Sequence, residues 1–281
     1  MPDALSLPEP PADRPVLMAV VNVTPDSFSD GGRWFDADAA VTHGHQLIAE
    51  GADILDVGGE STRPGAARPD ETEELRRILP VVTELASAGA RVSVDTMRSR
   101  VAAAALEAGA SLVNDVSGGL ADPDMARVVA DARAPYVAMH WRGHSKDMQS
   151  RAVYGDVVAD VRRELEERVE ALLEAGVRRE SLIVDPGFGF AKTTEQNWEM
   201  LARLTEFERL GLPLLAGTSR KSFLSRVGSL DGEPLPPDQR DEATAATSVL
   251  LAQAGVWGVR VHEVRATAVA FEVLARTRGT S

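Results

Sequence analysis

Eight short runs of apolar residues recur along the chain, and polar or charged residues mark their ends. The runs are nearly continuous in Val, Ile and Leu, a pattern typical of parallel strands that are buried on both faces. Helix-forming sequence, or a loop followed by a helix, separates each run from the next. Eight such strand–helix units predict a single-domain (β/α)₈ TIM barrel. The predicted strands cover residues 17–24, 53–59, 91–96, 111–117, 136–141, 182–187, 213–219 and 256–262.

Amphipathic periodicity predicts the helices between these strands. In segment 71–87, for example, Ile78, Val82 and Leu85 fall on one helical face. Pro80 lies inside this segment, so we expect either a kink or a later helix start. Further helices are expected over residues 157–175, 195–210, 241–254 and 264–276. Glycines just before the strands are expected to end helices in the left-handed conformation, at Gly51, Gly89, Gly109, Gly176, Gly211 and Gly255.

The two ends of the chain lie outside the repeating pattern. Residues 1–15 are rich in proline and predict a flexible N-terminal tail, and residues 277–281 predict a flexible C-terminal tail. The barrel domain is expected over residues 16–276. A doubly wound sheet is the alternative fold, but the first strand leads into Asn-Val-Thr-Pro-Asp-Ser-Phe, which lacks the glycines of a dinucleotide-binding turn.

Three connections that follow predicted strands are long, at residues 25–35, 60–69 and 142–154. Connections of this kind lie on the rim where barrels carry catalysis, so all three are candidate lids. A fourth irregular stretch, 228–237, is expected to be an exposed excursion.

Composition narrows the classes of function. The 281 residues carry a formal net charge of −13, which argues against non-specific nucleic-acid binding but leaves room for a local basic cluster that binds an anionic substrate. The chain has no cysteine, which excludes disulfides and thiolate catalysis. There is no signal-peptide pattern and no apolar run near the roughly 20 residues of a membrane span. We therefore expect a cytoplasmic protein without nucleic-acid or membrane partners.

The polar residues at the strand ends fall into two groups by charge. Because residues i and i+2 of a strand share a face, Arg260 and His262 should project together, whereas Asn114 should point away from Asp115. Barrels frequently bind phosphate at the loops after strands seven and eight. The rim therefore suggests a ligand with a nitrogen-rich heterocycle at one end and a phosphate at the other. The acidic and amide group is Asp56, Asp95, Asn114, Asp115 and Asp185, and the other group is Ser219, Arg220, Lys221, Arg260 and His262.

Structural interpretations compete with functional ones at several positions. Asp56 is a candidate support for the second long loop rather than a substrate contact. His140 neighbours Met139 and cannot share its face, so only one of them should line the pocket. Phe188 and Phe190 flank Gly189, and a packing role is as plausible as a binding role for each.

Eight short motifs, in order, resemble those of the dihydropteroate synthase family, and their sequences look closest to those of actinobacterial members. The first two are Leu-Met-Ala-Val-Val-Asn-Val-Thr-Pro-Asp-Ser-Phe-Ser-Asp-Gly-Gly and Asp-Ile-Leu-Asp-Val-Gly-Gly-Glu-Ser-Thr-Arg-Pro-Gly. Together the motifs extend the resemblance over residues 16–276. They occupy residues 17–32, 53–65, 92–96, 113–117, 139–141, 185–190, 219–222 and 260–262.

The resemblance implies a folate-pathway transferase that joins p-aminobenzoate to 6-hydroxymethyl-7,8-dihydropterin diphosphate, giving 7,8-dihydropteroate and diphosphate. It implies Mg²⁺ as cofactor, held by Asn22 and the diphosphate, and sulfonamides as competitive inhibitors. It also implies a homodimer. The alternatives are a methyltransferase acting on methyltetrahydrofolate and a catalytically silent pterin-binding paralogue.

The resemblance also implies roles for individual residues. Lys221, Arg260 and His262 would be catalytic. The pterin ligands would be Asp95, Asn114, Met139, Asp185, Phe190 and Lys221; the diphosphate ligands would be Asn22, Arg260 and His262; the p-aminobenzoate pocket would contain Thr62, Arg63, Pro64, Phe190, Lys221 and Ser222.

Overall fold

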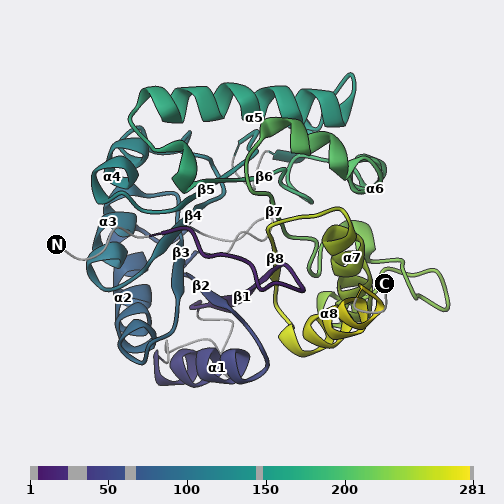
Figure 1. Cartoon of the computed structure of the whole chain (residues 1–281), viewed down its shortest axis with the longest axis horizontal. Coiled ribbons are helices and arrows are strands. Elements are labelled where there is room, and N and C mark those ends of the chain that lie inside the picture. The colour runs from purple at the N-terminus through teal and green to yellow at the C-terminus, as the bar shows by residue number, and fades with distance from the viewer. Residues whose placement is uncertain (1–5, 25–36, 61–67, 144–147, 279–281) are drawn as a thin grey trace.

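The computed structural model describes residues 6–24, 37–60, 68–143 and 148–278. Eight parallel strands form its centre, in the order β6-β5-β4-β3-β2-β1-β8-β7 (Figure 1). Between β6 and β7 a single bridge joins Val184 to Leu214, and the amide of Val184 donates to the carbonyl of Pro213 at 3.0 Å. These contacts close the sheet into a barrel, which confirms the predicted fold. Because neighbouring strands are consecutive in the chain, the doubly wound alternative is wrong.

All eight predicted strands are present, each shorter than the apolar run that predicted it. The difference arises because the runs continue into the connections at the strand ends. The strands are β1 Val16–Asn22, β2 Ile54–Gly58, β3 Val92–Asp95, β4 Leu112–Asp115, β5 Tyr136–Met139, β6 Leu182–Asp185, β7 Leu215–Ala216 and β8 Gly258–Val261.

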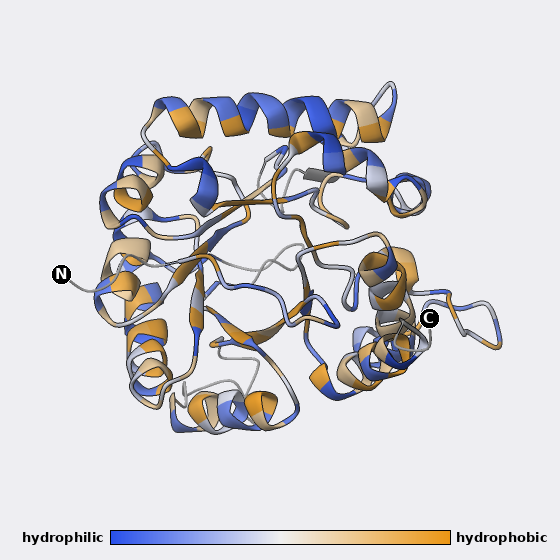
Figure 2. Cartoon of the chain, in the orientation of Figure 1, coloured by the Kyte–Doolittle hydropathy of each residue, from blue (hydrophilic) through white to orange (hydrophobic). Residues whose placement is uncertain are grey.

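Helices surround the barrel, and apolar positions concentrate on their inner sides (Figure 2). All six glycines expected to end helices have positive φ, between 61° at Gly211 and 112° at Gly51. The α-helices are α1 Ala37–Ala49, α2 Glu71–Ser87, α3 Ser99–Glu107, α4 Met125–Ala132, α5 Val157–Glu174, α6 Thr194–Ala202, α7 Asp241–Gln253 and α8 Val264–Arg278. Short 3₁₀ helices are η1 Met148–Arg151, η2 Arg179–Ser181, η3 Leu204–Leu210, η4 Ser222–Leu224 and η5 Pro237–Gln239.

One helix prediction is confirmed and one needs correction. The segment 71–87 forms a helix over its full predicted length, and the later start allowed for Pro80 does not occur, because the side chain of Asp70 accepts a hydrogen bond from the amide of Glu73 at 2.8 Å and so caps the first turn. The segment 195–210 is not one helix. It divides at Arg203, whose φ of −113° is not helical, into α6 and η3.

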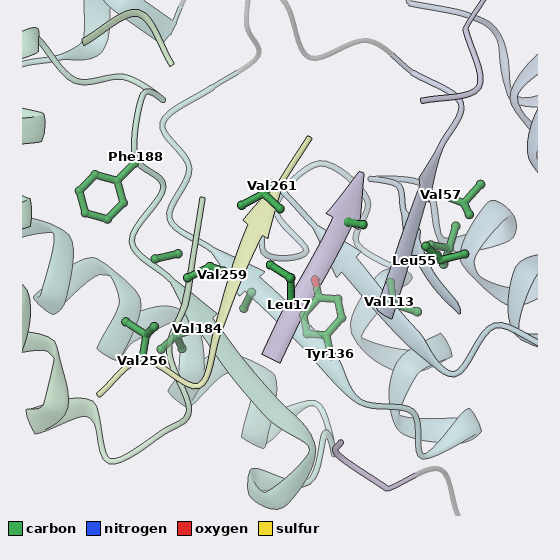
Figure 3. Packing of buried hydrophobic residues seen from close by; sticks show 14 of the residues in the cluster. Leu17, Leu55, Val57, Val113, Tyr136, Val184, Phe188, Val256, Val259 and Val261 are labelled. Atoms are coloured by element: carbon green, nitrogen blue, oxygen red, sulfur yellow. The ribbon is translucent and has the colours of Figure 1, made fainter. Parts of the chain in front are cut away.

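Alternation along the strands separates two hydrophobic layers. Val16 and Met18 of β1 belong to a cluster inside the barrel, whereas Leu17 belongs to the layer between strands and helices. Figure 3 shows part of that outer layer, including Leu17, Tyr136 and Val259. Since the inward positions recur every second residue, they continue up each strand to the polar ends. The inner cluster is Val16, Met18, Ile54, Leu112, Val137, Ile183, Leu215 and Trp257.

The segment that precedes β1 closes the amino-terminal end of the barrel. Leu7 packs against the inner cluster, and the indole N–H of Trp257 donates to the carbonyl of Pro8 at 2.9 Å. The guanidinium of Arg14 binds Asp53, with Nη2 and Oδ1 2.9 Å apart. These contacts correct the expectation of a flexible tail for residues 7–15. At the other end, α8 continues to Arg278, two residues beyond the expected boundary.

Two further expectations concern the exterior. The excursion 228–237 is exposed as expected, and Leu230 projects fully into solvent. In the described ranges, every helix is too short or too polar to traverse a lipid bilayer.

We predict that Trp257→Phe lowers the free energy of unfolding by about 1 kcal/mol, because it leaves the carbonyl of Pro8 without its donor. For a domain of this size that corresponds to a fall in Tm of about 2–4 °C, measured by calorimetry. Trp198→Phe is the control, because Trp198 lies at the surface of α6 with its ring edge-on to Phe223. Equal Tm values for Trp257→Phe and the unmodified protein would contradict this account of the barrel end.

Candidate active site

The inward positions at the carboxyl ends of the strands bring the candidate residues together. Asp56 is level with Ser93 in the register of β2 and β3, and Asp95 pairs in register with Asn114 of β4. Met139 of β5 pairs with Asp185 of β6. Asp56, Asn114, Met139 and Asp185 each lie two positions beyond an inward-facing residue of the same strand. Asp95 lies next to an outward-facing residue. The side chains therefore converge on the barrel mouth.

Arg260 is clamped between two of the carboxylates. Its Nε donates to Asp56 Oδ2 at 2.6 Å, and its Nη2 donates to Asp95 Oδ2 at 2.7 Å. The amide Nδ2 of Asn114 donates to the same Asp56 oxygen at 2.8 Å. Although burial acts to lower it, the charges of Asp56 and Asp95 raise the pKa of Arg260. The guanidinium is therefore a permanent, oriented cation.

This clamp corrects one expectation. The strand ends do not divide into separate acidic and basic edges, because Arg260 bridges the acidic group. Asp56 is completely buried and orients Arg260 and Asn114, whereas its expected support of the second loop concerns residues outside the described part of the chain. Its second oxygen, Oδ1, is buried and has no hydrogen-bond partner in the described part of the chain.

Asp95 and Asp185 hold their protons more tightly than ordinary aspartates. Burial raises the pKa of Asp95 to about 7, against the opposing charge of Arg260. Burial also raises the pKa of Asp185 to about 6, although the amide of Gly187 donates to its Oδ1 at 2.7 Å. Carboxyl groups with a pKa near neutrality can either accept or donate a hydrogen bond, which suits the edge of a nitrogen-rich heterocycle.

Lys221 lies against Phe190 at the opposite side of the mouth. Its Nζ is 3.9 Å from the centroid of the Phe190 ring, a cation–π contact. Burial and the charge of Arg260 lower the pKa of Lys221 to about 8, although Asp185 and Asp95 act to raise it. Gly189 permits this approach, because a Cβ there would lie 2.8 Å from Lys221 Cδ. Phe188 is instead buried and stacked on Phe223, so the two neighbouring phenylalanines have different roles.

His262 and Ser219 form a second polar pair at the mouth. The Nδ1 of His262 lies 2.9 Å from Ser219 Oγ, which also accepts from the His262 amide at 3.1 Å. Arg220 does not join them, because its guanidinium binds both oxygens of Asp241 at 2.8 Å. The interpretation of Arg220 as a phosphate ligand is therefore wrong. Ser222 is exposed and begins the 3₁₀ turn η4.

Alternation also decides the neighbouring pairs on β4 and β5. Asp115 points outward and accepts from the hydroxyl of Tyr136 at 2.8 Å, so Asn114 alone faces the pocket. His140 points outward and lies 2.9 Å from Glu164 of α5, which leaves Met139 on the inner face. A cavity of about 230 Å³ lies on this outer side, where His140, Glu164 and Arg168 line it.

The residues expected on the second loop, Thr62, Arg63 and Pro64, lie outside the described residues, as does the whole first loop, 25–35. The flanks of the second loop are described. Arg68 donates to Glu60 at 2.6 Å, and Arg98 donates to the other Glu60 oxygen at 3.1 Å and to the carbonyl of Pro69 at 2.7 Å. Both ends of the loop are thus fixed beside the barrel mouth.

Asn22 is the candidate metal ligand. It lies at the end of β1 and is partly exposed. No group of three or more His, Cys, Asp or Glu side chains able to hold a metal occurs within the described residues. An amide oxygen fits Mg²⁺, which prefers hard oxygen ligands and commonly keeps water and substrate phosphates as its other ligands.

Sequence reasoning missed Lys192, which is buried behind the connection between β6 and α6. The available signal was compositional, because the chain contains 27 arginines but only three lysines. A lysine in so arginine-rich a chain indicates a position that requires a compact ammonium group.

Fold and site together define a barrel enzyme whose mouth combines carboxyl groups with fixed cations. The model of the pterin-binding enzyme family matches residues 18–262. A curated dihydropteroate synthase from Mycobacterium leprae is 54% identical over 260 residues, which cover 92% of each chain.

Solved structures give the same result. The chain is similar to Xanthomonas albilineans dihydropteroate synthase with 4-aminobenzoic acid, with a TM-score of 0.87 and 46% identity over 96% of this chain and 95% of that one. It is also similar to Yersinia pestis dihydropteroate synthase in a sulfonamide drug complex, with a TM-score of 0.87 and 39% identity over 95% of each chain. The chain belongs to the dihydropteroate synthase family.

We predict that Asp185→Asn changes the pH dependence of stability. Because the pKa of Asp185 is about 6 in the folded protein and near 3.8 unfolded, the folded state binds more protons between these values. The unmodified protein should therefore lose stability relative to the variant as pH rises from 4 to 6. Urea unfolding at pH 4 and pH 7.5 measures this difference, and a difference that is independent of pH would contradict the burial argument.

Proposed function

We propose that the barrel mouth transfers the pterinylmethyl group of 6-hydroxymethyl-7,8-dihydropterin diphosphate to the amine of p-aminobenzoate. The products are 7,8-dihydropteroate and diphosphate. The observation that carries the proposal is the Arg260 clamp, because one fixed cation stands beside three polar groups suited to a pterin edge. Membership of the dihydropteroate synthase family supports the same reaction.

The pterin is proposed to lie against Asp95, Asn114 and Asp185. Asn114 gives its Nδ2 to Asp56, so its carbonyl oxygen remains to accept from the ligand. A 2-amino-pyrimidinone edge can donate to carboxyl and amide oxygens in turn. Met139 and the ring of Phe190 would pack on the faces of the heterocycle.

The diphosphate is proposed to leave toward Arg260 and His262. The C–O bond of the CH₂–O–phosphate group breaks with its electron pair on oxygen, the amine nitrogen bonds to the CH₂ carbon, and the amine loses a proton. Arg260 uses Nε and Nη2 for the carboxylates, so Nη1 is left to donate to a phosphate oxygen. Fixed cations stabilise the negative charge that develops on the leaving group.

Asn22 would hold Mg²⁺ together with the diphosphate. When bound, the metal supplies Lewis-acid stabilisation of the phosphate oxygens. The remaining work falls to residues of the chain. Asp95 and Asp185 favour positive charge that develops on the pterin ring, and Lys221 restrains the position of both substrates from beside Phe190.

The p-aminobenzoate pocket is proposed between Phe190, Lys221 and Ser222, with Thr62, Arg63 and Pro64 on its other side. The Lys221 ammonium would bind p-aminobenzoate, and the Phe190 ring would form an apolar wall of the pocket. Sulfonamides resemble p-aminobenzoate in shape and charge, so we expect them to compete for this pocket. The Yersinia pestis enzyme with a sulfonamide drug supports this expectation.

One assay separates the proposed reaction from the two alternatives. We expect diphosphate release that requires both p-aminobenzoate and Mg²⁺ and that a sulfonamide inhibits competitively with p-aminobenzoate. A methyltransferase would release no diphosphate, and a silent paralogue would bind pterin without turnover. Release independent of p-aminobenzoate would also contradict the proposal.

We predict that Lys221→Ala and Arg260→Ala each lower kcat/KM for the pterin diphosphate by about 100-fold or more, since each removes a charged group that faces the reacting atoms. Arg220→Ala is the matched control from the same Ser-Arg-Lys motif. Its guanidinium is held by Asp241, so we expect a lower Tm with kcat/KM within about threefold of the unmodified enzyme. Near-normal kinetics for Lys221→Ala or Arg260→Ala would contradict their roles.

We further propose a cytoplasmic homodimer. A diphosphate substrate carries several negative charges and crosses membranes poorly, which favours a cytoplasmic enzyme. Packed helices α7 and α8 expose Leu250, Val269 and Val273, an apolar set suited to a second copy of the chain. Light scattering at micromolar concentration should give twice the mass of the 30.0 kDa chain, and a monomer would contradict the proposal.

A further inference from the structure

A second cluster of ionisable side chains lies outside the barrel, behind the connection between β6 and α6. It contains His140 from the end of β5, Glu164 from α5 and Lys192 from the connection itself. The proposed chemistry does not use any of these groups. They are nevertheless close to it, because Lys192 is two residues from Phe190 and contacts its backbone.

Lys192 is almost completely buried, with 3% of its surface exposed. Its Nζ lies 3.0 Å from the carbonyl of Gly187, 3.1 Å from the carbonyl of Phe190 and 3.2 Å from His140 Nδ1. Burial lowers the pKa of Lys192 to about 7, although the charge of Asp185 acts to raise it. In its protonated form the ammonium has three donors, and each donor has one acceptor here. Two of the acceptors belong to the connection that follows Asp185 and carries Phe190. Lys192 thus binds this connection from behind at two points.

The ring of His140 orients Lys192. Its Nε2 lies 2.9 Å from Glu164, which Arg142 also binds through Nε at 3.0 Å. Burial and the nearby Lys192 lower the pKa of His140 to about 4, so the ring is neutral at pH 7. Its one proton therefore lies on Nε2 toward Glu164, and the lone pair on Nδ1 faces Lys192.

The connection depends on such contacts because its backbone is unusual. Gly187, Gly189 and the non-glycine residue Ala191 have φ values of 70°, 76° and 48°. The hydroxyl of Tyr154 donates to the carbonyl of Ala191 at 3.0 Å. A left-handed non-glycine residue persists only where surrounding structure determines it. The contacts from behind therefore set the position of the Phe190 ring against Lys221.

The choice of lysine supports a specific role for the ammonium. The chain uses arginine at 27 positions and lysine at three, of which Lys192 and Lys221 are described. The three acceptors around Lys192 converge on one point, whereas the donors of arginine spread in a plane. Arginine would not match this set of acceptors.

We propose that Lys192 is a positioning residue of the synthase, and that its ammonium, oriented by His140 and Glu164, fixes the β6–α6 connection so that Phe190 forms the wall of the p-aminobenzoate pocket. The consequence for catalysis rests on the proposed function. The tether, by which we mean the attachment of the β6–α6 connection by Lys192, does not rest on the proposed function. It can be measured in the protein without ligand.

The experiment compares three variants with a matched control. Lys192→Met removes the ammonium. His140→Asn keeps an acceptor near the position of Nδ1, whereas His140→Gln keeps only the group that faces Glu164. Tyr136→Phe is the control, because it also removes one buried hydrogen bond on the outer side of β5, to Asp115, away from the connection.

The first readout is hydrogen exchange of the backbone amides in residues 186–193, followed by mass spectrometry in the absence of ligand. We expect exchange to rise about tenfold in Lys192→Met and His140→Gln, the equivalent of one lost charge-assisted hydrogen bond. We expect little change in His140→Asn and Tyr136→Phe. Unchanged exchange in Lys192→Met and His140→Gln would overturn the tether, whatever reaction the protein catalyses.

The second readout is steady-state kinetics. We expect KM for p-aminobenzoate to rise about tenfold in Lys192→Met and His140→Gln while kcat changes by less than about threefold, and His140→Asn to restore KM. Equal losses in both histidine variants would indicate general destabilisation and overturn the proposal. If Lys192→Met fails to fold, the two histidine variants carry the test. If the unmodified protein shows no turnover, the proposed function fails and hydrogen exchange alone decides the tether.

Discussion

The buried ion pairs of Arg260 are the interaction on which the site depends. A guanidinium at the mouth of an apolar barrel requires carboxylate partners, because an unpaired buried charge is strongly destabilising. Asp56 and Asp95 supply them, and Asp56 binds Asn114 with the same oxygen. One buried carboxylate therefore fixes Arg260, the proposed partner of the leaving group, together with Asn114, the proposed pterin ligand. In this proposal the two ends of the substrate would be bound by side chains that share one hydrogen-bond acceptor.

The fold was predictable from the sequence because a (β/α)₈ barrel repeats one pattern eight times. Each apolar run contained a strand. Alternation showed that only one of Asn114 and Asp115, and only one of Met139 and His140, could face the pocket, and the structure places Asn114 and Met139 there. Helix continuity was less predictable. Segment 71–87 runs through Pro80 as one helix, whereas Arg203 interrupts segment 195–210, which was expected to be one helix.

The candidate site was predictable in its members but not in their partners. Grouping the strand-end residues by charge placed Arg220 with Lys221, yet an ion pair with Asp241 of α7 holds Arg220 away from the mouth. The same grouping separated Arg260 from the acidic residues that bind it. These pairings join residues up to 204 positions apart in the chain, and no local pattern encodes them. Lys192 was missed because its burial and its contact with His140, 52 positions away, arise only in the fold, although its other two acceptors are local.

The closure of the barrel between β6 and β7 has a consequence for the pocket. Other neighbouring strands pair over two to five residues, whereas one bridge joins Val184 to Leu214. Asp185 ends β6, and Lys221 follows the end of β7 by five residues, so the two residues flank this junction. Because the backbone joins these two strands at fewer positions than any other neighbouring pair, side-chain contacts would set more of the spacing between the proposed pterin and p-aminobenzoate subsites here. In the proposed arrangement, the two substrates would meet where the ring of strands is least continuous.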